Sequence, residues 1–198
     1  MSIPKLKPVR VALLGESPND TTSLKILLEQ RYVGRIQVFA LLKNLKADKV
    51  GGLKAQRMLP KLYAEARPDI VVFTRDLDAL DSDQRQRQKR QQEFDEVNRC
   101  VGGAAIFLLH IYEFEALIMA HVAAFNALYK CACKPQADPM RIVDPKGKLQ
   151  AASRKGPRGS YAETDCAEVC KHLNYAQLVK NCGYFREFDA EFAARLPR

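Results

Sequence analysis

Four short apolar runs alternate along the chain with longer stretches whose apolar residues recur at helical spacing. The runs are "VRVALLG" (9–15), "IQVFALL" (36–42), "DIVVFT" (69–74) and "AAIFLLH" (104–110). They are short and rich in branched side chains, which predicts β-strands. The third run is apolar at almost every position, which indicates a strand buried on both faces, as in a parallel sheet.

Between these strands the pattern predicts helices. Segment 19–32 carries three leucines at helical spacing behind an Asn19/Asp20 cap. Pro60 should bend or interrupt the next helix, because proline cannot donate the helical hydrogen bond. Further helices are expected at 51–66, 81–100 and 112–130. Strands alternating with helices predict an α/β fold with a parallel sheet of about four strands, flanked by helices.

The last third of the chain is predicted to extend this fold with helices. Residues 141–158 are rich in glycine, proline and basic side chains, which indicates a loop. Two or three helices should follow near 160–173, 174–182 and 184–196. We therefore expect an α/β domain over residues 1–135, and a basic loop with C-terminal helices over 136–198 packed on the same domain.

The composition favours a cytoplasmic protein. No apolar run approaches the roughly 20 residues that a membrane span needs, and the basic N-terminus precedes too short an apolar stretch for a signal peptide. The six cysteines are expected to be reduced in such a protein. Neither Cys131/Cys133 nor Cys166/Cys170 has the spacing of a zinc knuckle, so a zinc site is disfavoured.

The charge balance predicts a phosphate-bearing partner. The chain has 32 Lys and Arg residues against 23 Asp and Glu, a net charge of +9. The basic run 84–92 is interpreted as a solvated helix face. The loop at 141–158 is expected to hold a nucleic-acid backbone without reading its sequence, and DNA is favoured over RNA. The residues assigned to this contact are Arg141, Lys148, Arg154, Lys155 and Arg158.

Acidic residues gather where the predicted strands end. Asp76 and Asp78 directly follow the third strand, and Glu16 ends the first. Glu113 and Glu115 follow the fourth; in a helix, only one of them could face a shared site. Since the carboxyl ends of parallel strands meet at one edge, these carboxylates should lie together. Carboxylate oxygens suit Mg²⁺ or Mn²⁺, although an acidic loop that caps a helix is the simpler alternative.

For Glu16 and Asp20 the sequence allows two roles each. Glu16 is placed to be a metal ligand or a general base, or only a loop carboxylate near a helix N-terminus. Asp20 is placed to cap the helix or to join the metal site. Arg75 is expected to pair with the acidic cluster or to contact phosphate.

In order and position, Glu16 and "Asp76-Leu77-Asp78" resemble the TOPRIM domain of topoisomerases, primases and the nucleases of the overcoming-lysogenisation-defect group. More specifically, the chain is similar to small bacterial TOPRIM-like proteins. In those a segment like "EFEALIMAH" follows the fourth strand, and segments like "DPKGKL" and "SYAET" come later. The likeness covers roughly residues 9–130 well and 140–196 loosely.

The resemblance implies a Rossmann-like TOPRIM fold and a metal-dependent nuclease, the effector of an ATPase-associated bacterial defence or DNA-processing system. It implies Mg²⁺ or Mn²⁺ bound by Glu16, Asp20, Asp76, Asp78 and Glu115, with Lys146 steadying phosphate charge beside the catalytic Glu16, Asp76 and Asp78. One departure is that Ser17 stands where TOPRIM domains have glycine. That departure favours the alternative, a TOPRIM-like scaffold that binds an ATPase or nucleic acid without turnover.

Overall fold

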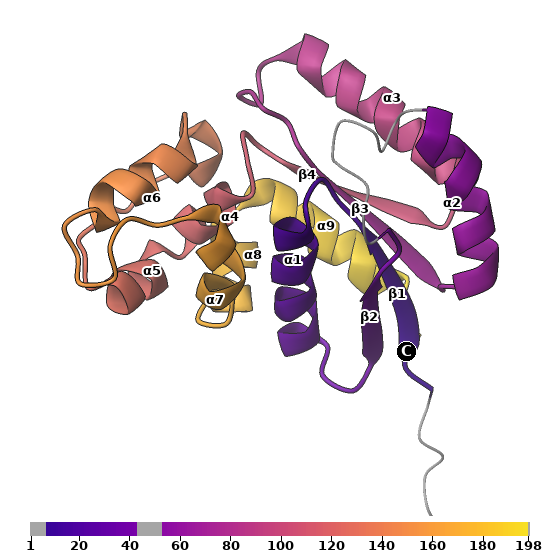
Figure 1. Cartoon of the computed structure of the whole chain (residues 1–198), viewed down its shortest axis with the longest axis horizontal. Helices are drawn as coiled ribbons and strands as arrows, with labels where there is room; N and C mark the ends of the chain where they lie inside the picture. Colours follow the sequence, from indigo (N-terminus) through magenta and orange to yellow (C-terminus); the bar gives the residue numbers. More distant parts are fainter. Residues whose placement is uncertain (1–6, 43–52, 198) are drawn as a thin grey trace, which may run out of the picture.

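The computed structural model describes residues 7–42 and 53–197, and it shows an α/β fold around a four-stranded, all-parallel sheet (Figure 1). The strands lie in the order β2-β1-β3-β4. The predicted fold class is therefore confirmed in its general shape. Strand β3 runs to Asp76, two residues beyond its predicted end, so Asp76 belongs to the strand itself. The strands are β1 (Val9–Leu14), β2 (Ile36–Ala40), β3 (Ile70–Asp76) and β4 (Ala105–His110).

Helices cover both faces of the sheet, and alternate side chains of β1 enter the two cores that result. Val11 and Leu13 pack with α1 (Pro18–Arg31) and α9 (Gly183–Ala194), whereas Ala12 and Leu14 pack with α2 (Leu53–Ala66) and α3 (Gln84–Cys100). This alternation is the two-residue period of a strand, and it explains why the strands are apolar throughout. Figure 1 shows α2 and α3 on the side away from α1.

The two edge strands each have a cationic side chain bonded to their backbone. Lys25 Nζ donates to the carbonyl oxygen of Val38 in β2 over 3.1 Å. Arg195 Nη2 donates to the carbonyl oxygen of Ala105 in β4 over 3.2 Å. Both cations come from helices that pack on the same face of the sheet.

Helix α1 begins differently from the prediction. Its N-cap is Ser17, not Asn19 or Asp20. The Ser17 hydroxyl accepts from the Asp20 amide, and the Asp20 carboxylate accepts from the Ser17 amide, both over 3.2 Å. This is a capping box, which satisfies two backbone donors at once. Ser17 therefore fixes the start of the helix directly after Glu16.

Helix α2 continues through Pro60 without interruption. Proline leaves the carbonyl four residues earlier, that of Gln56, without its helical donor. The Cys100 thiol of α3 donates to this carbonyl over 3.8 Å. Of the two effects predicted for Pro60, a bend or an interruption, the interruption is wrong. The predicted helix start at residues 51 and 52 lies outside the described residues.

The long helix predicted at 112–130 is two shorter helices, α4 (Glu115–Ala120) and α5 (Val122–Tyr129). The break falls at His121, whose φ of −135° is not helical. The His121 ring accepts a hydrogen bond from the Asn174 amide over 3.0 Å, which fixes the break by a tertiary contact. Because α4 begins only at Glu115, Glu113 lies before the helix.

The prediction of a basic loop over 141–158 is wrong for its middle part, which is a helix. Helix α6 (Pro145–Ser153) begins with Asp144 as its N-cap, which accepts from the Gly147 amide over 2.8 Å. Proline suits the first turn of a helix, where its missing N–H is not needed. Leu149 and Ser153 then lie buried on one face of α6.

The C-terminal region is helical, as predicted. A 3-10 turn, η2 (Pro139–Arg141), precedes α6, and a second, η3 (Glu163–Asp165), leads into α7 (Cys166–Cys170), α8 (Tyr175–Asn181) and α9. The larger hydrophobic core runs without a break from β1 and α1 into these helices. All six cysteines are free. None of the described helices is long and apolar enough to cross a membrane.

Substituting Gly15 with alanine should destabilise the fold and displace Glu16. An alanine Cβ would lie 2.7 Å from the Thr74 methyl group and 2.9 Å from the Thr21 methyl group. Overpacking of this kind costs about 1–3 kcal/mol of unfolding free energy, which chemical denaturation would measure. Gly183→Ala is the control, because its Cβ would lie 3.2 Å from the flexible Met140 side chain and 3.7 Å from the end of the Arg186 side chain, and both can move aside. Equal stabilities of the two variants would contradict this account.

Candidate functional site

Glu16 and Asp76 are brought together by the adjacent carboxyl ends of β1 and β3. Leu14, the last residue of β1, pairs with Phe73, so Glu16, two residues further on, lies beside the last residues of β3. A Glu16 carboxylate oxygen then accepts from the Asp76 amide over 3.3 Å. The same oxygen forms an ion pair with Arg75. Glu16 is thus held at the sheet edge despite the serine that follows it.

The Asp-Leu-Asp segment is fixed by backbone bonds that continue past the strands. The Leu77 amide donates to the His110 carbonyl and the Asp78 amide to the Tyr112 carbonyl, both over 2.9 Å. Asp78 and Tyr112 adopt left-handed backbone conformations, with φ of 57° and 66°. Leu77 turns into the core, Asp76 is half-buried and Asp78 is exposed.

Glu113 and Glu115 both lie beside Lys146; the expectation that only one of them could face the site assumed that both were helical, and Glu113 is not. The Glu113 carboxylate accepts from the Lys146 backbone amide over 2.8 Å and lies 3.5 Å from its ammonium group. Glu115 is buried, accepts from the Tyr161 hydroxyl over 3.1 Å and lies 3.9 Å from the Lys146 ammonium. Glu113 can reach in because it precedes α4. The segments "EFEALIMAH", "DPKGKL" and "SYAET" therefore meet at Glu115.

Asp76 is the electrostatic centre of the site. Its pKa is raised well above the ordinary value, first by burial and then by the negative charges of neighbouring carboxylates. Those neighbours, in order of effect, are Asp20, Glu16, Glu115 and Asp78. Among the residues that the structure describes, no hydrogen bond or ion pair reaches the Asp76 carboxylate. All five acids predicted as metal ligands thus share one electrostatic neighbourhood.

Two further carboxyl groups at the site also hold their protons more tightly than usual. Burial raises the pKa of Asp20 to about 6, against the stabilising bonds of Ser17. Burial raises the pKa of Glu115 to about 7, although the nearby Lys146 ammonium lowers it. Asp20 therefore has its capping role in this structure and also lies within the electrostatic reach of Asp76.

A chain of alternating charges connects the two exposed ends of the acidic cluster. Arg75 bonds Glu16 and also donates from Nε to Glu93 over 2.8 Å. Arg90 donates to Glu93 over 3.0 Å and forms an ion pair with Asp78. Arg75 therefore pairs with the acidic cluster, one of its two predicted roles. We call this run, Glu16–Arg75–Glu93–Arg90–Asp78, the arginine bridge.

The donor set fits a hard divalent cation by its chemistry, because every candidate ligand is a carboxylate. In the described parts of the chain, however, no three His, Cys, Asp or Glu side chains converge closely enough to hold a metal ion. The arginine bridge gives a physical reason, since Glu16 and Asp78 are each turned towards a guanidinium group. A metal at this edge would be held by Asp76 and Asp78 with Glu16, and by Glu115 and Asp20 on the other side.

Sequence reasoning missed Arg90 and Glu93. The basic run 84–92 was interpreted as a solvated face, which holds for Arg85 and Lys89, but Arg90 is only 3% exposed. Charge runs do not reveal which residue of a helical turn faces inward unless the helix is placed against its neighbours. One signal was available: Arg90 lies seven residues, or two helical turns, before Val97, so the two residues share the buried face of α3.

His110 and Tyr184 form a second contact that the sequence did not reveal. His110 pairs with Asp76 in the sheet register, and its Nε2 lies 2.8 Å from the Thr74 hydroxyl. Its Nδ1 lies 3.4 Å from the Tyr184 hydroxyl of α9. Burial lowers the pKa of His110 to about 3, so the ring is neutral. His110 therefore supports the strand end without adding positive charge to the site.

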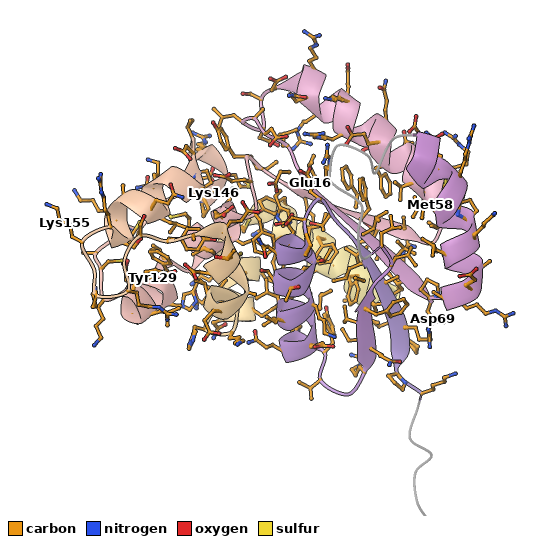
Figure 2. All side chains as sticks on the ribbon, in the orientation of Figure 1. Glu16, Met58, Asp69, Tyr129, Lys146 and Lys155 are labelled. Atoms are coloured by element: carbon orange, nitrogen blue, oxygen red, sulfur yellow. The ribbon has the colours of Figure 1, made fainter. Side chains whose placement is uncertain are left out.

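The residues predicted to contact nucleic acid lie apart from the acidic edge. Arg141, Lys148, Arg154, Lys155 and Arg158 are all exposed. Figure 2 shows Lys155 at the outer end of the α6 region, with Lys146 between it and Glu16. Basic residues thus extend from the candidate site across the helical region.

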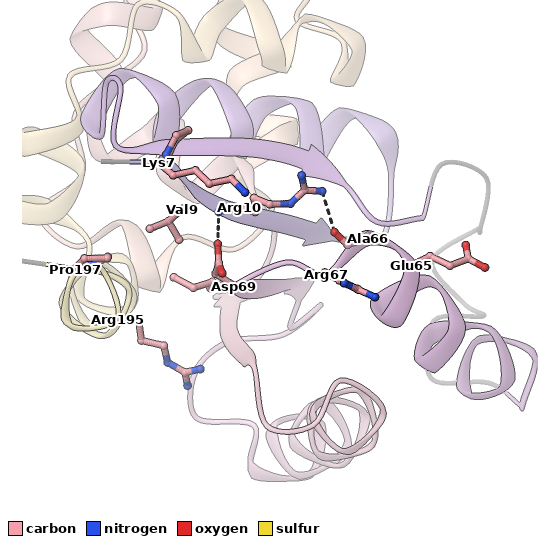
Figure 3. A pocket seen from close by; sticks show the side chains of 11 residues that line it. Lys7, Val9, Arg10, Glu65, Ala66, Arg67, Asp69, Arg195 and Pro197 are labelled. Carbon is pink, nitrogen blue, oxygen red and sulfur yellow. Dashed lines mark hydrogen bonds between the residues drawn. The ribbon is translucent and has the colours of Figure 1, made fainter. Parts of the chain in front are cut away.

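A cavity of about 860 Å³ lies at the opposite end of the sheet (Figure 3). It opens where β1 and β3 begin, and Arg10, Arg67, Asp69 and Arg195 are among the residues that line it. Arg10 donates to the Ala66 carbonyl there, over 2.8 Å. None of the predicted site residues lines this cavity, so it is separate from the acidic edge.

No protein-family model, curated protein or solved structure matches this chain. The candidate site therefore rests on its own geometry and charge.

The metal-free protein should lose stability as the pH rises from about 4 to about 7. The ordinary pKa values of Asp20 and Glu115 are 3.8 and 4.5, and the fold raises them to about 6 and about 7. In this range these two carboxyl groups keep protons in the folded state that the unfolded state releases, so they lower the free energy of unfolding as the pH rises. His110, whose pKa falls to about 3, acts in the opposite direction, but the raised pKa values of Asp76 and Glu16 add to the effect of Asp20 and Glu115. Thermal melts in a chelator at several pH values would show a falling melting temperature.

Asp76→Asn should flatten this pH dependence and raise the metal-free melting temperature at pH 7.5 by about 2–4 °C, because asparagine at this position requires neither an unpaired negative charge nor the uptake of a proton. Asp95→Asn is the matched control, since Asp95 is exposed and its bonding partner among the described residues is Gln91, over 2.8 Å. A melting temperature that rises with pH equally in all three proteins would contradict the electrostatic account.

Proposed function

We propose that this protein is a metal-dependent phosphodiester hydrolase that acts on nucleic acid. One observation carries the proposal: the half-buried Asp76 carboxylate lies without a bonding partner, among the described residues, within reach of four other acids. A chain of net charge +9 would not be expected to concentrate acid at one sheet edge unless a cation is to be bound there. The resemblance to TOPRIM nucleases points to the same chemistry.

In this proposal Asp76, Asp78 and Glu16 hold one Mg²⁺ or Mn²⁺ ion, and Asp20 and Glu115 help to hold a second. The bound metal would supply an activated water molecule and stabilise charge on the phosphate. Glu16 is also placed to accept a proton from water. Lys146 brings a positive charge to the acidic edge, where three carboxylates within 3.9 Å position its ammonium group.

The partner and setting follow from charge and resemblance. The exposed Arg141, Lys148, Arg154, Lys155 and Arg158 would bind the phosphate backbone, with DNA favoured over RNA. An ATPase partner and a role in bacterial defence or DNA processing come from the resemblance alone. Six free cysteines suit a cytoplasmic location.

The arginine bridge supports a second candidate, a TOPRIM-like scaffold without turnover. Arg75 and Arg90 already neutralise Glu16 and Asp78, which a protein without metal chemistry would require. Such a scaffold would bind an ATPase or nucleic acid through its basic surface.

Cleavage of plasmid DNA and of single-stranded RNA in Mn²⁺ or Mg²⁺ tests the hydrolase. We expect the wild-type protein to cut DNA, and Asp76→Ala to lower the rate on the order of 100-fold or more, because the central ligand is lost. Asp95→Ala should keep the wild-type rate. Equal cleavage by wild type and Asp76→Ala would show that any activity in the preparation comes from elsewhere.

Metal-induced stabilisation separates the two candidates. For a hydrolase, Mn²⁺ at about 100 times its Kd should add about 2.7 kcal/mol to the free energy of unfolding. In a chain of this size that raises the melting temperature by about 5–11 °C. The rise should vanish in Asp76→Ala. A melting temperature that ignores both metals in the wild type would favour the scaffold.

A further inference from the structure

Arg90 is a buried cation whose position is unusual for this helix. Only 3% of its surface is exposed, although its neighbours Lys89 and Gln91 are exposed. Its terminal nitrogens bond Asp78 and Glu93, while its Nε is buried with no hydrogen-bond partner among the described residues. A buried donor left unpaired costs free energy, so the two carboxylates are what hold the guanidinium in place.

The two partners of Arg90 differ in how easily they can leave it. The Asp78 side chain is 58% exposed and stands on a left-handed loop residue, whereas that of Glu93 is 19% exposed. Glu93 is also held by Arg75, over 2.8 Å. If Asp78 turned away, Arg90 would keep its bonds to Glu93 and stay charge-paired. The contact between Arg90 and Asp78 is therefore the weakest point of the arginine bridge.

We propose that Arg90 is a built-in competitor for the metal site: it binds the Asp78 carboxylate in the metal-free protein, and a divalent cation must displace it. The inference rests on the proposed function, because it takes Asp78 as a metal ligand. The ion pair with Arg90 offsets the negative charge of Asp78 and turns one of its oxygens towards the guanidinium, and a metal beside Arg90 would be repelled by its charge. Metal uptake is then an exchange of cations on Asp78.

The exchange makes the affinity for metal depend on α3, which contributes no metal ligand. Arg75 takes the corresponding place on Glu16, so the same bridge restrains both outer ligands of Asp76. Removal of the Arg90 guanidinium should therefore free Asp78 without removing any oxygen donor. If Arg90 instead held the ligands in position, its removal would weaken metal binding.

Isothermal calorimetry with MgCl₂ and MnCl₂ at constant ionic strength tests this on full-length wild type, Arg90→Gln and Arg87→Gln. We expect Arg90→Gln to bind metal about three- to tenfold more tightly than wild type, the range that loss of a competing ion pair supports. Arg87 lies on the same helix, pairs with Asp81 and carries the same charge. Arg87→Gln therefore controls for net charge. Binding by Arg90→Gln that is no tighter than that of Arg87→Gln would overturn the proposal.

Should Arg90→Gln fail to fold, as judged by circular dichroism, the wild-type protein gives a second measurement. The ¹⁵N resonance of the Arg90 side chain, assigned by its absence in Arg90→Lys, should shift as MgCl₂ is added. A resonance unchanged at saturating metal would overturn the exchange.

The outcomes also separate this inference from the proposed function. Metal binding by Arg90→Gln but not by wild type would support the exchange strongly. Equal binding by both would remove the exchange and leave the hydrolase intact. Binding by neither protein, with no cleavage, would remove the proposed function itself and the exchange with it.

Discussion

Repulsion among carboxylates at the carboxyl edge of the sheet is the constraint on which the rest of the site depends. Parallel strands must end side by side, so acids that follow β1, β3 and β4 come close whatever the surrounding loops do. Asp76 lies at the centre and has a strongly raised pKa as a result. Every other element that reaches this edge can be understood as a response to that charge.

Three cationic side chains, each from a different element, lie against these carboxylates. Strand β3 itself carries Arg75, α3 turns Arg90 inward and α6 places Lys146 against Glu113 and Glu115. Among the described residues, Asp76 and Asp20 form no ion pair with these cations, and Asp20 bonds Ser17 instead. The arrangement therefore keeps the outer carboxylates neutralised and leaves the central one to bind a proton or a metal ion. This selectivity distinguishes the site from an acidic surface, where all carboxylates would be hydrated alike.

The sequence predicted those parts that depend on local pattern. Apolar runs identified all four strands, and the geometry of parallel sheets then placed Glu16, Asp76, Asp78 and Glu115 at one edge. What it could not predict depends on tertiary contacts. The break at His121 is held by a bond from Asn174, and the late start of α4 leaves Glu113 outside the helix, where it bonds the Lys146 amide.

Other features were concealed by composition. Glycine and basic residues masked α6, although the Asp144-Pro145 pair is a regular helix start. The same emphasis on charge obscured Arg90, because a run of basic residues looks solvated until its helix is packed. Glu115 bonds Tyr161, which lies 46 residues further along the chain, and it also lies beside Lys146. No sequence periodicity connects such distant positions.

The bonds from Lys25 to Val38 and from Arg195 to Ala105 have a consequence for the behaviour of the whole chain in concentrated solution. Sheets with open edges can grow by adding strands from other molecules, which leads to aggregation. Here each outer strand carries a long cationic side chain on its backbone, and an approaching copy would bring the same positive charge to the same place. The two cationic side chains thus discourage extension of the sheet at both of its edges.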